Sequence, residues 1–179
     1  MKKLNKKGFT LIELLAVIVI LAIIVVVTVP TIINTIADAR VQSIWNLAGE
    51  TANSYNTGVA QDLLTPGKAL QGANATSEWQ CIGAITTTAT GATAKNLAEV
   101  LDLSSNDLVL TGTAPTDTNL KTNNYIPAQS ICSAIKLNGA GGAVVFLNAK
   151  ENGKFAVSGK VVYALSTEDA GHANTKTNG

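Results

Sequence analysis

The sequence is poor in the residues that build most catalytic and metal sites. Its 179 residues include one histidine, His172, and two cysteines, Cys81 and Cys132. A histidine-based triad would therefore depend on a residue in the polar C-terminal tail. A structural zinc ion needs about four ligands, which two cysteines and one distant histidine do not supply. The sequence also shows no phosphate-binding loop and no nucleophile–base pair, so we expect no enzyme activity, no metal and no cofactor.

Charged residues are scarce as well, at 14%, and the net charge is +1. This balance argues against a protein that binds nucleic acid through bulk electrostatics. One group of lysines lies near a predicted hairpin: Lys136, Lys150, Lys154 and Lys160. These lysines could form a local DNA-binding patch, although scattered solvated lysines are the simpler interpretation.

Apolar residues, in contrast, are concentrated near the N-terminus. The first eight residues carry four lysines and no acid, and residues 14–37 form an uncharged stretch of 24 residues. About 20 apolar residues, rising 1.5 Å each, cross a hydrocarbon core of about 30 Å. Lysines just before such a span keep the N-terminus in the cytoplasm. The sequence therefore predicts one membrane-spanning helix, with the rest of the chain outside.

Two ordinary interpretations of this segment are a secretory signal peptide and a plain signal anchor. Ala37-Asp38-Ala39 has the small residues of a signal-peptidase site, and cleavage there would start the chain at Arg40. However, the apolar block is longer than the 7–15 residues typical of a signal peptide. A signal anchor would retain the N-terminal lysines.

A third interpretation rests on Glu13, because a carboxylate within an apolar span is costly. Its context is Lys6-Lys7-Gly8-Phe9-Thr10-Leu11-Ile12-Glu13-Leu14-Leu15, followed by apolar residues up to Pro30. This segment closely resembles the leader and cleavage motif of type IV prepilins and type II secretion pseudopilins. The resemblance covers about residues 6–30.

The resemblance implies a defined processing scheme. Residues 1–8 would be a leader that a membrane prepilin peptidase removes after Gly8, and the same enzyme would N-methylate Phe9. The mature chain would have 171 residues, with nine basic against 12 acidic ones. Residues 9–37 would form the membrane and filament-core helix, and residues 38–179 an extracellular head domain.

The resemblance also implies roles in subunit assembly for Phe9, Glu13 and Pro30. The Glu13 carboxylate would pair with the Phe9 amine of a neighbouring identical subunit, which removes two buried-charge penalties and sets the axial register. Pro30 removes one helical hydrogen bond and should bend the helix or let it unwind locally. A membrane platform protein with a cytoplasmic ATPase would drive assembly of the helical homopolymer.

The rest of the chain predicts an α+β head. Apolar or small residues recur at helical spacing to Tyr55, so one helix should run from about Thr10 to Tyr55, apolar in its first half and amphipathic in its second. Alternating segments at 131–137, 143–149 and 155–165 predict an antiparallel sheet of three to four strands. The Asn152-Gly153 pair predicts a tight hairpin turn. A helix packed on one face of such a sheet is a two-layer, pilin-like arrangement.

Cys81 and Cys132 both follow the membrane segment, so they lie outside the cytoplasm in this scheme. A pair of cysteines in an oxidising compartment usually forms a disulfide. The alternative is two buried free thiols. Many pilins place their disulfide around a shorter C-terminal loop than this pair would close.

These observations predict a structural subunit, a pilin, of a type IV pilus or related filament that serves adhesion, motility or DNA uptake. The precursor would be held in the cytoplasmic membrane by a single spanning helix and would then be assembled into a pilus on the cell surface. The alternatives are a pseudopilin of a type II secretion system and a membrane-anchored binding module that forms no filament.

Overall fold

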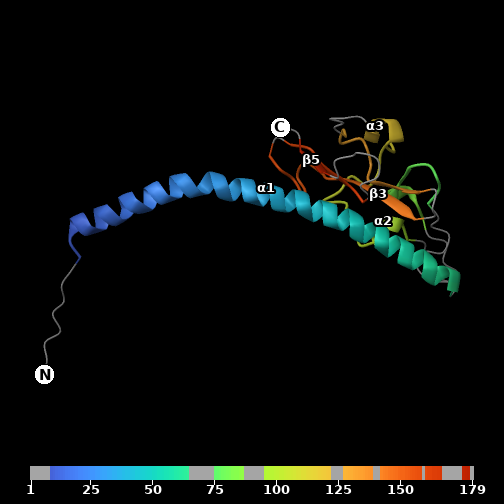
Figure 1. Cartoon of the computed structure of the whole chain (residues 1–179), viewed down its shortest axis with the longest axis horizontal. Helices are drawn as coiled ribbons and strands as arrows, with labels where there is room; N and C mark the ends of the chain where they lie inside the picture. The colour runs from blue at the N-terminus through green and yellow to red at the C-terminus, as the bar shows by residue number, and fades with distance from the viewer. Residues whose placement is uncertain are drawn as a thin grey trace, which may run out of the picture. The chain divides into compact units, whose positions relative to one another are not determined.

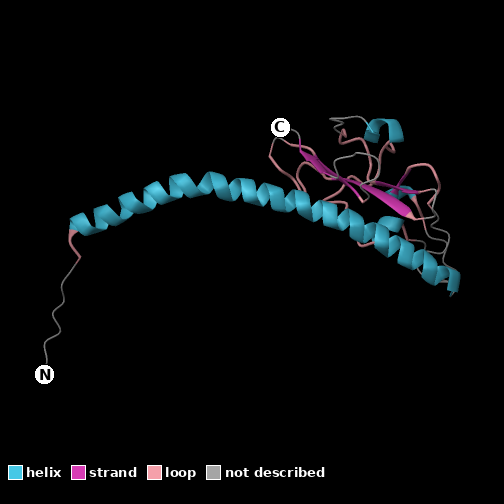
Figure 2. Ribbon diagram, viewed as in Figure 1, coloured by secondary structure: helices cyan, strands magenta, loops and turns pink. Residues whose placement is uncertain are grey.

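The computed structural model describes residues 9–64, 75–86, 95–121, 127–138, 142–158, 160–166 and 175–177. The chain forms two compact units, and the boundary between them lies between Asp38 and Ala39, within the first helix. Figure 1 follows the helices and strands along the chain, and Figure 2 distinguishes them by type.

Helix α1 spans Leu11–Leu64, and its 54 residues rise about 81 Å. It ends at Leu64 rather than near Tyr55. Up to Asp38 its large apolar side chains are exposed. Beyond Ala39 it becomes amphipathic, as predicted, and buries one stripe at steps of four, four and three residues: Ile44, Ala48, Ala52 and Tyr55.

The head contains a five-stranded antiparallel sheet with the strand order β1-β2-β3-β4-β5. The strands are β1 (Gln80–Cys81), β2 (Ala134–Leu137), β3 (Ala143–Asn148), β4 (Val162–Leu165) and β5 (Thr175–Thr177). Strands β2, β3 and β4 form the predicted meander, and β1 and β5 are short strands that extend it at its two edges. Ile135 lies opposite Val145, and Leu147 lies opposite Ala164.

Side-chain alternation divides the sheet into two buried faces. One face packs against the second half of α1 in the main core, which includes Ile135, Val145, Leu147, Val162 and Ala164. The opposite face carries Val144, Phe146, Tyr163 and Leu165, with Trp79 and Leu120 packed on them. All six residues of β3 are buried, because both faces of the sheet are covered.

Three short helices complete the head: η1 (Ile82–Ala84), α2 (Leu97–Val100) and α3 (Asp117–Lys121). The Asn96 side chain caps α2 by accepting the Glu99 N–H at 2.8 Å. At its C-terminal end, Asp102 adopts the left-handed conformation with φ of 55°. The Leu103 N–H bonds the Ala98 carbonyl at 2.8 Å, which completes a Schellman-type cap.

The predicted long strand over residues 155–165 is wrong in its first half. Strand β4 begins at Val162, and the connection from β3 is a folded loop rather than a two-residue hairpin. Asp107 organises this loop: its carbonyl accepts the Lys150 N–H and its carboxylate accepts the Lys154 N–H, both at 2.9 Å. Gly153 is pressed against Asp107, since an added Cβ would lie 2.7 Å from the Asp107 Cα.

These observations confirm the predicted fold class. The head is an α+β domain in which a long N-terminal helix packs on one face of an antiparallel sheet. The arrangement is pilin-like.

Candidate functional site

The candidate site at the N-terminal end of α1 is built around Glu13. Helix α1 begins at Leu11, which makes Thr10 the N-cap and Glu13 the third helical residue. The Glu13 Oε2 atom accepts hydrogen bonds from the Thr10 backbone N–H at 2.7 Å and from the Thr10 hydroxyl at 2.9 Å. The Glu13 N–H contacts the Thr10 hydroxyl oxygen at 3.3 Å. This reciprocal arrangement is a capping box.

The capping box changes the interpretation of Glu13. From the sequence we expected Glu13 to be an unpaired acid that needs a cation. In the structure, the Thr10 N–H and the Thr10 hydroxyl already donate hydrogen bonds to its carboxylate. The positive end of the helix macrodipole lies in the same turn. Among the described residues, both bonds go to Oε2, and the second oxygen, Oε1, accepts none. The capping box therefore fixes the orientation of the carboxylate and leaves Oε1 able to accept another hydrogen bond.

We did not infer a role for Thr10 from the sequence. The signal was present, because Thr10-Leu11-Ile12-Glu13 has the Thr-x-x-Glu spacing that marks a capping box before an apolar run.

Within the part of the chain that the structure describes, nothing covers Phe9 and the apolar residues that follow it. The Phe9 side chain is 89% exposed, and every leucine, isoleucine and valine from Leu11 to Ile36 is at least 43% exposed. A water-soluble monomer does not expose an apolar surface of this extent. By length and composition, α1 contains a segment that can cross a membrane.

Pro30 lies inside α1, which continues on both sides of it without a break in its helical assignment. Proline has no N–H, so the carbonyl of Val26 lacks the donor that an α-helix places four residues later. The leader residues 1–8, including the predicted cleavage residue Gly8, lie outside the described residues.

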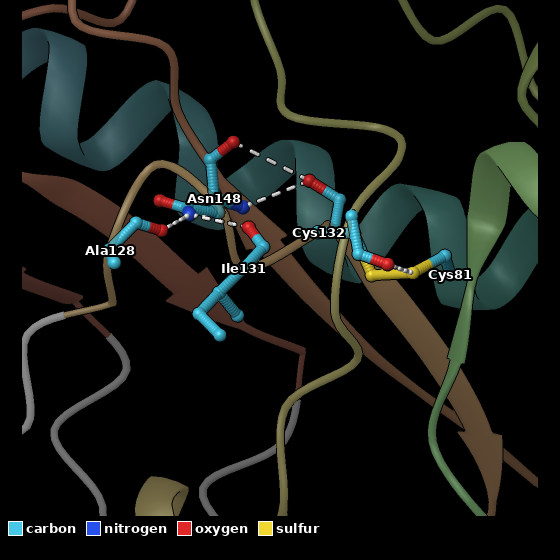
Figure 3. Close-up of a disulfide and its surroundings, with 7 residues drawn as sticks. Cys81, Ala128, Ile131, Cys132 and Asn148 are labelled. Atoms are coloured by element: carbon cyan, nitrogen blue, oxygen red, sulfur yellow. Dashed lines mark hydrogen bonds between the residues drawn. A yellow bond between two sulfur atoms is a disulfide. The ribbon is translucent and has the colours of Figure 1, made fainter.

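In the head, Cys81 and Cys132 form a disulfide, with their Cα atoms 5.6 Å apart. It links the edge strand β1 to the residue two positions before β2. Cys132 is fully buried and Cys81 is 9% exposed. The bond closes a sequence separation of 51 residues, and Figure 3 shows its surroundings.

Asn148 is a buried polar residue that sequence reasoning missed. Its side-chain Nδ2 donates to the carbonyls of Ala128 and Ile131 at 3.0 and 2.7 Å (Figure 3). Both carbonyls belong to the segment that leads to Cys132. Asn148 therefore anchors that segment to β3. No periodic pattern reveals this role, because it depends on a loop folding back over the end of a strand.

The lysines considered for DNA binding do not form a free basic cluster. The Lys136 ammonium lies 2.5 Å from an Asp117 carboxylate oxygen, which also accepts the Trp79 indole N–H at 2.7 Å. The Lys154 ammonium lies 3.6 Å from Asp107. Two of the four lysines thus have acidic partners.

Metal ligands do not cluster in the described part of the chain. It contains no group of three or more His, Cys, Asp or Glu side chains that could hold a metal ion.

Comparison with known proteins gives one match. Residues 3–29 match the family model of the prokaryotic N-terminal methylation motif. No curated protein and no solved structure matches the chain. The motif implies processing by a prepilin peptidase, and with the apolar helix it indicates a membrane-anchored precursor. The chain therefore carries, at residues 3–29, the leader signature of type IV pilins and pseudopilins.

Proposed function

We propose that this chain is a structural subunit, a pilin, of a type IV pilus or a closely related filament. The precursor spans the cytoplasmic membrane, is cleaved after Gly8, is N-methylated at Phe9 and joins a helical homopolymer. The subunit itself catalyses no reaction. The observation that carries the proposal is the methylation motif at residues 3–29, which continues directly into an uncovered apolar helix.

The exposed apolar surface has two successive environments in this proposal. In the precursor, lipid covers it, and in the filament, the same surface of neighbouring subunits covers it. Helices in lipid gain little from hydrophobic burial against one another, because lipid tails are equally apolar. Polar contacts are therefore needed to determine which helices pack together and how they are positioned relative to one another along the filament axis.

Glu13 supplies the first such contact. The capping box presents its carboxylate with Oε1 still able to accept a hydrogen bond. The methylated amine of Phe9 in a neighbouring subunit is cationic and would otherwise be buried without a partner. Pairing the two groups gives the amine a partner and neutralises both charges, which fixes the position of one subunit relative to the next.

Within this class, the disulfide favours a pilus over a secretion pseudopilin, because pseudopilins of the main secretion type usually lack one. The acidic neighbours of Lys136 and Lys154 favour adhesion or motility over direct DNA binding by the head.

The mature N-terminus tests the proposal. Protein sheared from cells and analysed by mass spectrometry should begin at N-methylated Phe9. A chain that begins at Met1 would indicate a membrane-anchored binding module. A chain that begins at Arg40 would indicate signal-peptide cleavage. Either of these results would rule out the filament mechanism.

Glu13→Gln tests the charge pair separately from the cap. Glutamine can still accept the Thr10 hydrogen bonds, so the helix start should persist, and cleavage after Gly8 should continue. The variant loses the negative charge, so the yield of surface filaments should fall sharply. Glu50→Gln, at an exposed acid of the head portion of α1, is the matched control and should assemble normally. Normal filament yield from Glu13→Gln would contradict the pairing.

A further inference from the structure

The loop between β3 and β4 contains a dipeptide that is prone to a spontaneous chemical change. Asn152 is followed by Gly153. An asparagine in this position loses its side-chain amide readily, because glycine has no side chain to hinder the next backbone nitrogen. Asn152 is exposed, so water and base can reach it. Burial therefore does not protect this residue.

The change is deamidation through a cyclic imide. The Gly153 nitrogen gives up its proton and attacks the side-chain carbonyl carbon of Asn152, Cγ. A bond forms between these two atoms, the bond from Cγ to Nδ2 breaks, and the amide nitrogen leaves as ammonia. Water then opens the imide to aspartate or to isoaspartate, which carries one additional carbon atom in the main chain. The first step needs a Gly153 nitrogen that can lose its proton and approach Cγ.

In the structure, the Gly153 N–H already has a hydrogen-bond partner. It donates to the Lys150 carbonyl at 3.1 Å, which closes a turn over residues 150–153. A bonded N–H is withheld from base until the turn opens, as in protected amide hydrogen exchange. Deamidation at Asn152 therefore requires a local opening of the loop.

Asp107 holds this turn at both of its ends. Its carbonyl accepts the Lys150 N–H and its carboxylate accepts the Lys154 N–H, both at 2.9 Å. Gly153 has little room to move between these bonds, since an added Cβ would lie 2.7 Å from the Asp107 Cα. Asp107 is itself held in place, because the next residue, Leu108, is buried in the main core.

We propose that the fold protects Asn152 from deamidation and that Asp107 maintains this protection. The exposed loop is chemically reactive by its sequence, and its hydrogen bonds to Asp107 keep the reacting nitrogen bonded to Lys150. The protection depends on the head alone, so it is independent of the proposed filament function.

Deamidation would damage a loop that supports the head. The additional main-chain carbon of isoaspartate would be inserted beside Gly153, which already lies against the backbone of Asp107. Two residues farther along, Phe155 is buried in the main core, and the carbonyl of Ala156 accepts a hydrogen bond from Arg40 of α1. A displaced loop would disturb both contacts.

Comparison of the full chain with a peptide tests the protection. The full chain in mild detergent and a synthetic peptide of residues 146–158 are incubated in the same warm, slightly alkaline buffer. Proteolysis and mass spectrometry then follow deamidation at Asn152. The full chain should react about tenfold more slowly than the peptide, or slower still, because the hydrogen bonds of the turn must open first. Equal rates would overturn the inference.

Hydrogen exchange of the wild-type chain provides a check that needs no variant. The Gly153 N–H should exchange slowly with deuterium although it lies in a surface loop. Its protection relative to the peptide should agree within about threefold with the protection against deamidation, because the same opening precedes both reactions. Exchange as fast as in the peptide would show that this N–H is not held, and would overturn the inference.

Asp107→Ala tests the role of Asp107. It removes the acceptor of the Lys154 N–H, so deamidation at Asn152 should become about tenfold faster. Asp107→Asn is the matched control, because its side-chain oxygen can still accept this hydrogen bond, and it should react like the wild type. A wild-type rate in Asp107→Ala would show that another residue maintains the protection.

The N–H groups of β3 distinguish opening of the loop from unfolding of the head. In Asp107→Ala they should exchange as slowly as in the wild type, while the Gly153 N–H exchanges faster. If the N–H groups of β3 lose protection to the same extent as that of Gly153, Asp107 stabilises the whole head, and its proposed role as the anchor of this turn fails.

Discussion

Removal of the disulfide by the double substitution Cys81→Ala and Cys132→Ala should destabilise the head severely. A covalent link across 51 residues lowers the entropy of the unfolded chain. In the chain-entropy model this contributes roughly 4 kcal/mol at 25 °C. Cys132 is completely buried beside Ala134, so truncation also leaves a small void. We therefore expect a loss of about 4–5 kcal/mol in the free energy of unfolding, a large part of the stability of an ordinary domain.

Denaturant unfolding of the full chain in mild detergent, followed by circular dichroism, measures this loss. The wild-type chain unfolded in the presence of a reductant is the matched control, because it loses the cross-link but keeps both sulfur atoms in place. If the cross-link dominates, the variant and the reduced protein should lose similar free energy relative to the oxidised protein. A loss below about 1 kcal/mol in both would refute the reasoning, since the loop-closure term alone exceeds that value.

Three further substitutions test other parts of the structure. Thr10→Val removes the hydroxyl from the capping box and should weaken the first turn of α1 by about 1 kcal/mol. Amide hydrogen exchange at Glu13 and Leu14 should become roughly fivefold faster, whereas the control Thr10→Ser should exchange like the wild type. Asp102→Gly should raise the unfolding free energy by about 0.5–1 kcal/mol, because glycine adopts the left-handed conformation at this position without a steric penalty, and a lower denaturation midpoint would contradict this. Asn148→Asp should cost about 2–3 kcal/mol or more, since a carboxylate would replace the donor that faces two buried carbonyls, and a denaturation midpoint equal to that of the wild type would show that the anchor is dispensable.

The sequence by itself determined the N-terminal part of this protein. The leader motif and the apolar span are continuous local segments, so both were predicted. The Thr10–Glu13 capping box is equally local, but its role was recognised only from the structure. The uncharged stretch from Leu14 to Ala37 is long and apolar enough to cross a membrane by composition alone. The amphipathic stripe after Ala39 and the meander β2–β4 were predicted for the same reason: helix and strand periods are local properties of the chain.

The predictions failed where distant residues compete with the local pattern. The alternation at 155–165 favours one long strand, yet β4 begins only at Val162. Hydrogen bonds from Lys150 and Lys154 to Asp107, more than 40 positions away, fold the preceding residues into a loop. Phe155 is buried in the main core, as its apolar side chain predicts, but it belongs to that loop and not to a strand.

Only the tertiary structure decided the contacts that join separated segments. The sequence left Cys81 and Cys132 as either a disulfide or two thiols, and the packing of β1 beside β2 brings their Cα atoms to 5.6 Å. Asn148 looked like an ordinary strand residue until the folded chain placed two carbonyls beside its amide. Local spacing carries no information about such pairs, because their distance is fixed by how the whole head packs around its sheet.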